Sequence, residues 1–343
     1  MILRGQLIVP LFCLVAVHLV VLLAGFFSPY DFAEQDRDAP YAPPVRIHWV
    51  NEEGRFLWHP FIYRWIQQPG EFQAYREDTQ RPYPIHLLPQ GSQYSIVSTL
   101  SWNRHLFGVD APAHIWLMGA DGYGRDLFTR VLYGGRISLF VGLAATLLTL
   151  TLAVSLGTLA GFYGGWLDAA VMRFVDIFLA LPWLCVLLAL RAFLPLHVGP
   201  AEAFLLLVMV IGTVGWARPA RLVRGVVLSA KERNHILAAR SFGAPDLYLL
   251  RRHILPETRD VVLTQAALLI PQYILAEVTL SFLGLGIGEP VPSWGSMLTS
   301  LQQYYVLASK WWMFFPAMFL IPVCLSYGLM SNALQQGMNR AEE

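Results

Sequence analysis

Charged residues are scarce in this 343-residue chain, at 14% of the total, and only two of them are lysines. A soluble domain carries nearer a quarter of charged residues. Hydrophobic residues make up 56% of the sequence, and the formal net charge is only +1. The composition therefore predicts a membrane protein, and the near-neutral charge gives no case for nucleic-acid binding.

Cysteines are equally sparse. Cys13, Cys185 and Cys324 fall in three separate apolar runs, with neither a disulfide framework nor a metal-ligand spacing, and we expect them to be small buried apolar residues. The phosphate-loop pattern G-x-x-x-x-G-K-[ST] is absent, because neither Lys231 nor Lys310 follows a glycine. H-E-x-x-H is absent too. We therefore predict no ATP site of that kind, no metal site and no catalytic residue.

Six apolar stretches are long enough to cross a membrane, whose hydrocarbon core requires roughly 20 residues per helix. They are residues 7–27, 137–166, 174–195, 201–217, 261–288 and 311–336. The first stretch exceeds the apolar region of about 7 to 15 residues in a cleaved secretory signal, so we predict an uncleaved anchor. The predicted fold class is an all-α polytopic membrane protein with six transmembrane helices.

The placement of Arg and Lys predicts the orientation of these helices. Basic residues cluster between the fourth and fifth stretches, which we therefore expect to be cytoplasmic, and both termini would then be cytoplasmic as well. The predicted domains are an N-terminal anchor helix at 1–27, an external insertion at 28–120 and a permease-like core at 121–343. Three arginines lie on the external side against the rule, which long external segments tolerate. They are Arg125, Arg130 and Arg136.

The external insertion contains short pieces that look extended. Alternation over 46–50 predicts a strand, and Gly54 follows it in a predicted turn. A small mixed or β-rich subdomain and an irregular solvated loop both remain open. Residues 121–133 predict an amphipathic helix at the membrane interface. Its apolar side would carry Leu127, Val131 and Leu132, and its polar side Arg125, Asp126 and Arg130.

A short basic hairpin, LAARSFGAPDLYLLRRHILP, occupies residues 237–256 between apolar stretches. A helical pattern continues from Lys231, and Gly243 stands where a helix would end in a left-handed residue. Pro245 suits the first turn of a second short helix, which Pro256 would end. From the residues alone, this hairpin is either a docking element for another protein or an amphipathic loop whose arginines bind anionic membrane lipid.

The hairpin resembles the EAA loop in permease subunits of binding-protein-dependent ABC transporters, whose pattern is E-A-A, three residues, G, nine residues and I-x-L-P. Leu237 replaces the Glu, and His253 occupies the first position of I-x-L-P. The resemblance implies that a coupling loop at about 229–257 contacts ATPase subunits. Its assigned residues are Leu237, Ala238, Ala239, Arg240, Gly243, Pro245, Asp246, His253, Leu255 and Pro256.

Four further blocks resemble the C-type permease of dipeptide and oligopeptide transporters, and the likeness covers roughly residues 117–336. They begin MGADGYGRDLF, GFYGGWLDAAV, VGWARPARLVRG and ILAEVTLSFLGLG. The resemblance implies a bacterial inner-membrane importer subunit, with peptides as cargo or another small solute such as a metal chelate or glycoside. It also implies a homologous second permease in a heterodimer, one or two cytoplasmic ATPase subunits that hold ATP and Mg, and an extracytoplasmic solute-binding protein.

A few other positions carry predictions. Glu277 lies about midway through a span, where an ionisable group usually faces protein or water. Together with Ser281 and Trp294 it is a candidate for the pore or for a polar network between helices. Gly157 and Gly161 are spaced for close helix packing. A membrane-embedded enzyme and a receptor or scaffold remain alternative classes, and the absence of an associated ATPase would favour the scaffold.

Overall fold

The structure is a computed structural model that describes residues 2–50, 54–68, 74–97, 100–195 and 198–342. The chain divides into two compact units. The first comprises Met1–Leu14, Leu139–Leu280 and Val323–Glu343, and the second comprises Val15–Ser138 and Ser281–Pro322. Most of the described residues are helical, as the apolar composition predicted.

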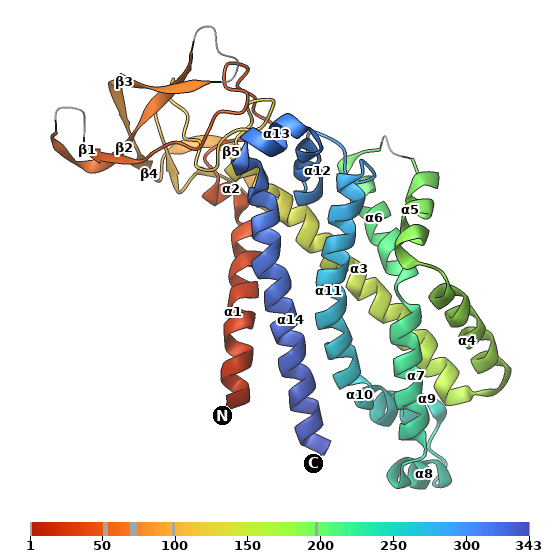
Figure 1. Ribbon diagram of the computed structural model, residues 1–343. Coiled ribbons are helices and arrows are strands. Elements are labelled where there is room, and N and C mark those ends of the chain that lie inside the picture. Colours follow the sequence, from red (N-terminus) through yellow and green to blue (C-terminus); the bar gives the residue numbers. More distant parts are fainter. Residues whose placement is uncertain (1, 51–53, 69–73, 98–99, 196–197, 343) are drawn as a thin grey trace. The chain divides into compact units, whose positions relative to one another are not determined.

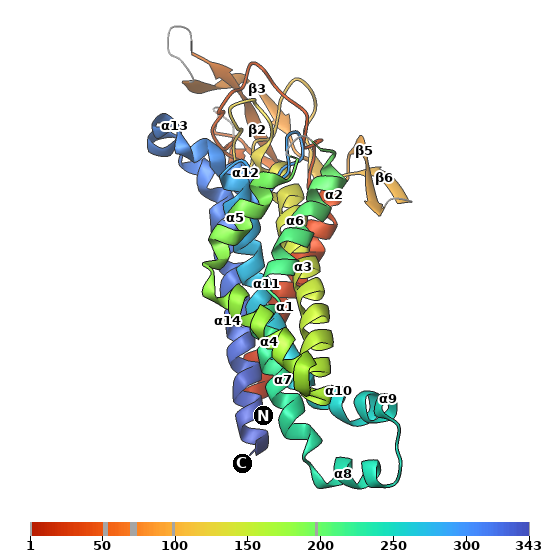
Figure 2. The same ribbon diagram turned by 90° about the vertical axis from the view of Figure 1, so that its right-hand side faces the viewer.

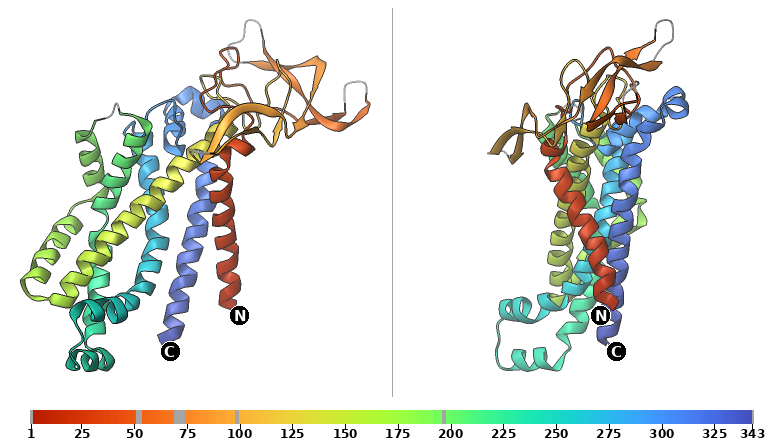
Figure 3. Two further views of the ribbon diagram at one scale, coloured as in Figure 1. Left: turned by 180° about the vertical axis from the view of Figure 1, so that it is seen from behind. Right: turned by 90° about the vertical axis from the view of Figure 1, so that its left-hand side faces the viewer.

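Helix α3, Leu127–Tyr163, is the longest helix among the described residues, with 37 residues, and Figure 3 shows it as one unbroken rod. The helices that follow in the first unit are α4 (Gly165–Ala180), α5 (Trp183–Phe193), α6 (Pro200–Val214), α7 (Ala217–Lys231), α8 (Asn234–Ser241), α9 (Asp246–Leu249), the π-helical turn η1 (Leu250–Ile254) and α10 (Leu255–Glu257). Helix α11, Arg259–Phe282, follows them and ends just inside the second unit.

Among the described residues, three helices are long and apolar enough to cross a membrane: Leu127–Tyr163, Arg259–Phe282 and Trp311–Gln336. Two further pairs of helices are bent, α4 with α5 by 92° and α6 with α7 by 48°, and they raise the number to five if each pair is one span. The apolar helix Ile8–Leu22 is shorter. The stretch predicted as a single helix at 174–195 is broken because Pro182 forces Leu181 into an extended conformation.

The second unit holds the strands, drawn in orange to yellow in Figure 1. An antiparallel three-stranded sheet has the order β1 (His48–Val50), β2 (Phe56–Gln67), β3 (Tyr75–Pro84). Two-stranded ladders pair β4 (His86–Leu87) with β7 (Phe107–Gly108), and β5 (Gln90–Val97) with β6 (Leu100–Arg104). Residues 28–120 thus contain ordered strands, and the strand predicted at 46–50 corresponds to β1.

A small apolar core supports this sheet. Ile62 of β2 and Tyr83 of β3 pack with Ala113 and Ile115, all buried. The turn predicted after β1 includes 51–53, which lie outside the described residues, and Gly54 has a φ of +76°. Such a φ favours glycine because other residues meet steric strain there.

The other helices among the described residues lie towards the two ends of the sequence. They are α1 (Ile2–Leu22), α2 (Ala24–Phe27), α12 (Trp294–Leu298), the 3-10 turn η2 (Thr299–Gln302), α13 (Tyr304–Ser309), the 3-10 turn η3 (Trp311–Phe314) and α14 (Phe315–Glu342). Helix α12 begins with a capping box, in which Ser293 accepts a hydrogen bond from the Ser296 backbone and the Ser296 hydroxyl accepts one from the Ser293 backbone.

The amphipathic helix predicted at 121–133 is wrong in both extent and polarity. Helix α3 begins only at Leu127, and the charged side of the predicted helix is buried rather than solvated. Arg125, Asp126 and Arg130 all have 5% exposure or less. Their burial is possible because each has polar partners, several of them distant in sequence, which periodicity cannot reveal.

Candidate functional site

The predicted coupling hairpin begins with a helix that does not continue from Lys231, contrary to the sequence pattern. Helix α7 ends there and α8 starts at Asn234, because Arg233 adopts an extended conformation with ψ of 139°. The Arg233 carbonyl accepts hydrogen bonds from the backbone N–H groups of Ile236 and Leu237, at 2.9 and 3.1 Å. Its side chain pairs with Glu257 at 2.7 Å, which ties the start of the hairpin to its end.

The end of α8 confirms the prediction for Gly243, whose φ is +85°. The backbone N–H of Gly243 donates to the Arg240 carbonyl at 3.0 Å, and that of Ala244 donates to the Ala239 carbonyl at 3.1 Å. This pair of bonds is the Schellman motif, which satisfies the last carbonyls of a helix and reverses the chain. A single glycine therefore sets the turn between the two arms of the hairpin.

The second arm begins as predicted but ends differently. The Pro245 carbonyl accepts hydrogen bonds from Tyr248 and Leu249, and α9 starts at Asp246. Pro256 does not end this arm, because the chain remains helical through η1 and α10. The π turn moves the Leu255 N–H onto the Leu250 carbonyl, and Pro256 then sits in the first turn of α10, where its missing N–H needs no acceptor.

An apolar cluster anchors the hairpin to the helices of the first unit. It joins Ile236 of α8 and Leu249 of α9 to Phe162 of α3 and Val227 of α7. The close packing of α3 on α7 depends on the predicted glycine pair. A Cβ atom at Gly157 would lie 2.5 Å from the Ala220 carbonyl oxygen, and one at Gly161 would lie 2.9 Å from the Val227 Cβ.

Two ion pairs join α4 to α7. The Asp168 carboxylate accepts two hydrogen bonds from the Arg224 guanidinium, each at 2.5 Å, and Asp176 pairs with Arg221. Asp168 and Asp176 thus each form an ion pair with an arginine of α7. The hairpin thus packs on α3 and α7, and α4 is joined to α7 by these ion pairs.

The outer face of the hairpin exposes large apolar side chains, and Figure 2 shows α8 beyond the end of α7, with α9 to one side. Phe242 at the turn is 92% exposed. Leu237, Leu247 and Tyr248 are exposed as well. Isolated exposed apolar residues are ordinary, but several on one short ordered hairpin are typical of an interaction surface.

The ten predicted coupling residues all lie on this hairpin. Two of them are half-buried: Ala239, which packs against the apolar cluster, and His253, whose ring contacts those of Tyr248 and His235. The other eight are exposed. They are Leu237, Ala238, Arg240, Gly243, Pro245, Asp246, Leu255 and Pro256. Phe242 is a surface residue that the sequence pattern did not single out.

The three other candidates lie away from the hairpin and are all buried. Glu277 and Ser281 lie in α11, with exposures of 0% and 3%. Trp294 is completely enclosed at the start of α12, and its indole N–H donates to the Val131 carbonyl at 2.9 Å. Within the described chain Trp294 therefore packs the second unit internally.

A buried ionic network in the second unit was not predicted. Glu289 contacts both Arg125 and Arg130, and Arg125 also pairs with Asp121 at 2.7 Å. Burial alone would raise the pKa of Glu289, but the hydrogen bond from Arg125 and the charges of both arginines outweigh it, and the net pKa is lowered. Arg136 instead donates to the Leu22 carbonyl at 2.7 Å. These contacts give each of the three arginines a polar partner within the second unit.

Comparison with known proteins gives matches over most of the chain. The family model described as "binding-protein-dependent transport system inner membrane component" matches residues 153–340. The dipeptide transport system permease protein DppC of Bacillus subtilis is 37% identical over 222 residues, which cover 64% of this chain and 67% of the relative. The oligopeptide transport system permease protein OppC of Haemophilus influenzae is 34% identical over 309 residues, 90% of this chain and 94% of the relative. A chain of the inward-facing MetNI methionine ABC transporter aligns with a TM-score of 0.45 at 17% identity, over 60% of this chain and 95% of that one.

Proposed function

The chain belongs to the family of binding-protein-dependent transport system inner membrane components, and from this premise we propose that it forms half of the translocation pore of an ATP-driven peptide importer. Peptide cargo is supported by the names of two relatives, a dipeptide and an oligopeptide permease. We propose that a homologous permease forms the other half, and that an extracytoplasmic binding protein delivers the peptide.

The proposed topology has six spans and cytoplasmic termini. Helix α1 supplies the first span, α3 the second, the two bent pairs the third and fourth, α11 the fifth and α14 the sixth. The hairpin that includes α8 and α9 then faces the cytoplasm, in agreement with its basic residues. Residues 28–120 face the external side.

The observation that carries the proposal is the position of Phe242, 92% exposed beside a glycine-set turn on an anchored hairpin. A large aromatic side chain held in water loses little conformational freedom when it enters a pocket of a partner, which is why such residues dominate interfaces. We propose that the partner is a cytoplasmic ATPase subunit, which binds ATP and Mg, since this chain has no phosphate-loop motif.

Coupling in this scheme is mechanical. Nucleotide can favour one conformation of the transporter only if the ATPase contacts the hairpin differently in its two states. The attachment of the hairpin to α7, and of α7 to α4, would carry that difference to the helices as a rigid-body movement. The ATPase supplies the free energy, and the hairpin transmits it.

Retention of partners by the tagged chain tests this proposal. The protein is purified from its native membrane in mild detergent, co-purifying proteins are identified by mass spectrometry, and ATP hydrolysis is measured in the eluate. We expect a second permease and ATPase subunits with the wild type, and at least about tenfold less ATPase with Phe242→Asp, as for loss of an interface anchor.

Trp58→Asp is the matched control, because Trp58 is 85% exposed but belongs to strand β2. It should retain the ATPase at the wild-type level. Recovery of the wild-type chain without any ATPase, in several detergents, would contradict the proposed function, and equal loss in both variants would contradict the role of Phe242. Uptake of a radiolabelled dipeptide, competed by unlabelled peptides but not by free amino acids, tests the cargo.

A further inference from the structure

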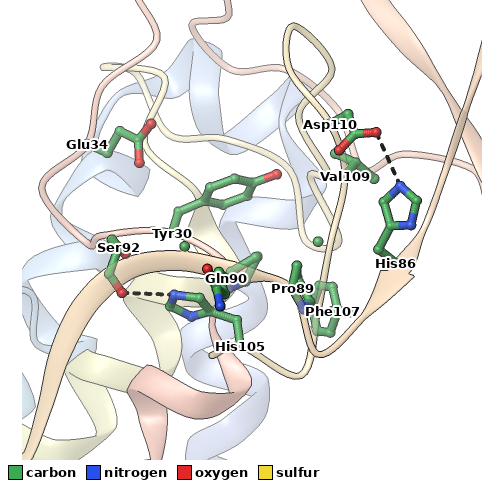
Figure 4. A pocket seen from close by; sticks show the side chains of 13 residues that line it. Tyr30, Glu34, His86, Pro89, Gln90, Ser92, His105, Phe107, Val109 and Asp110 are labelled. Atoms are coloured by element: carbon green, nitrogen blue, oxygen red, sulfur yellow. Dashed lines mark hydrogen bonds and ion pairs between the residues drawn. The ribbon is translucent and has the colours of Figure 1, made fainter. Parts of the chain in front are cut away.

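His105 is a buried histidine whose two ring nitrogens both face carbonyl oxygens. It follows strand β6 and is 2% exposed. Its Nδ1 lies 2.9 Å from the Gly25 carbonyl oxygen and 2.5 Å from that of Ser28, both at the end of the α1–α2 segment. Its Nε2 lies 3.0 Å from the carbonyl oxygen of Ser92 in β5, the contact drawn in Figure 4.

This arrangement requires a particular protonation state. A carbonyl oxygen only accepts hydrogen bonds, whereas a neutral imidazole carries a single N–H. Both nitrogens of His105 can donate at once only when the ring is an imidazolium. The neutral ring can keep its bond to the α1–α2 segment or its bond to β5, but never both, whichever tautomer it adopts.

The His105 ring packs closely against the surrounding backbone. A Cβ atom at Gly91 would lie 2.7 Å from the His105 ring, and one at Gly25 would lie 2.3 Å from the ring of Tyr94. The Tyr94 ring itself lies 5.2 Å from that of His105. Gly25 and Gly91 thus allow the α1–α2 segment, β5 and His105 to approach one another closely, because a side chain at either position would collide with a ring.

Titratable groups surround His105 on each side. A cavity of about 270 Å³ adjoins it, and Tyr30, Glu34 and the paired His86 and Asp110 lie on the walls, as Figure 4 shows. Burial raises the pKa values of Tyr30 and Glu34.

On the side of the α1–α2 segment, the Ser28 hydroxyl lies 2.8 Å from that of Thr129, which donates to Asp126 at 2.6 Å. Burial raises the pKa of Asp126 to about 7. Glu34 and Asp126 are thus the acidic groups on these two sides of His105, and the raised pKa of each favours its protonated, neutral form in acid.

We propose that His105 is a proton-dependent latch that fastens the β5–β6 hairpin to the end of the α1–α2 segment. The doubly protonated ring holds both segments. When one proton is lost, the remaining N–H stays on Nδ1, which faces two carbonyl oxygens rather than one, and β5 is released. Strand β5 also lines a second cavity, of about 360 Å³, which includes Asp31 and Arg136. Release of β5 would therefore alter that cavity as well. The proposed latch rests on the geometry of these contacts. Only the inference that the external pH acts on it rests on the proposed topology.

Hydrogen exchange in the assembled transporter tests the latch. Backbone amides of β5 and β6 are followed by mass spectrometry in lipid nanodiscs between about pH 5 and pH 8, the range in which histidine changes charge, with correction for chemical exchange at each pH. We expect protection of β5 in the wild type to fall by about tenfold or more as pH rises, as for loss of one charge-assisted hydrogen bond. The same amides in His105→Gln should show no such pH dependence.

His86→Gln is the matched control, because His86 lies on the wall of the same cavity but is exposed and paired with Asp110. It should keep the wild-type pH dependence. Protection of β5 that is independent of pH in the wild type, or a pH dependence that survives in His105→Gln, would overturn the latch.

If the His105→Gln variant fails to assemble, nitrogen-15 NMR of selectively labelled wild-type protein tests the proposal instead. A doubly protonated His105 near pH 5 that loses a proton towards pH 8 supports the proposal. A ring that stays neutral throughout refutes it.

Discussion

The Arg125 guanidinium donates hydrogen bonds of 2.6 and 3.2 Å to the two carboxylate oxygens of Glu289, although 164 positions separate these residues. Paired donors in this geometry are directional as well as strong. Arg130, only 2% exposed, approaches the same carboxylate at 3.2 Å. Glu289, together with Asp121, therefore offsets two buried cations, and it joins the segment before α12 to the start of α3.

Glu289→Gln should destabilise the protein by about 1–3 kcal/mol, because the glutamine keeps the size of the side chain but leaves Arg125 and Arg130 short of negative charge. The figure is modest since Glu289 is half exposed to solvent. Thermal unfolding of the purified chain measures it. Asp110→Asn, which breaks the exposed pair with His86, should cost no more than about 1 kcal/mol, and an equal cost in both variants would contradict the network.

The same ion pair predicts behaviour in acid. Because the pKa of Glu289 is lowered from its ordinary 4.5, its contribution to stability is complete above that pH and is lost as pH falls through the lowered value. Wild type and Glu289→Gln should therefore differ in melting temperature at neutral pH and converge in strong acid. A difference that persists unchanged at low pH would exclude a charge effect.

Asp126→Asn should change the pH dependence of stability in the direction opposite to that of Glu289→Gln. Burial raises the pKa of Asp126 from 3.8 to about 7, so the folded chain binds a proton more tightly than the unfolded chain does. Its contribution to stability is therefore largest below about pH 4 and declines as pH rises to about 7. We expect the melting temperature of the variant to exceed that of the wild type increasingly over this range. A constant difference would show that Asp126 does not titrate there.

Gly243→Val should leave the chain inserted in the membrane but reduce uptake at least about tenfold, since a β-branched residue is strained at a φ of +85° and the hairpin turn would be lost. Uptake into membrane vesicles, with co-purified ATPase as a second reading, measures the effect. Gly225→Val is the control, because Gly225 lies within α7 with no neighbouring atom within 4 Å of an added Cβ. Wild-type uptake by Gly243→Val would refute the role of the turn.

Asp168→Asn should separate ATP hydrolysis from transport. The variant weakens the bond between α4 and α7 but leaves the outer face of the hairpin intact, so ATPase subunits should still bind while uptake falls severalfold. Uptake per ATP hydrolysed in reconstituted vesicles gives the measurement. Asp176→Asn, in the more exposed ion pair with Arg221, should have a smaller effect. A parallel loss of bound ATPase would mean that Asp168 acts on docking instead.

Local chemistry made the turn of the hairpin predictable. Gly243 and Pro245 each have a backbone preference that does not depend on the rest of the fold, and the structure follows both. The prediction that Pro256 ends the second helix was wrong, because the effect of a proline depends on the hydrogen-bond register of the helix before it. The π turn over Leu250–Ile254 shifts the hydrogen-bond register, and no residue pattern in that segment announces it.

The second unit was less predictable for a related reason. Alternation was enough to find β1, but Glu289, which pairs with both Arg125 and Arg130, lies in a loop more than 150 positions away. Periodicity therefore assigned these residues to a solvated face. His105 belongs to no motif at all, since its environment consists of backbone carbonyls, and any residue type could have supplied those.

Helix α3 has a consequence for the bilayer itself. Its 37 residues extend about 55 Å at 1.5 Å per residue, whereas the hydrocarbon core is about 30 Å thick. The helix is therefore several turns longer than the hydrocarbon core. A thicker or thinner membrane requires only a change in the tilt of the helix or in the length of helix that lies among the headgroups. No unpaired polar backbone then enters the lipid.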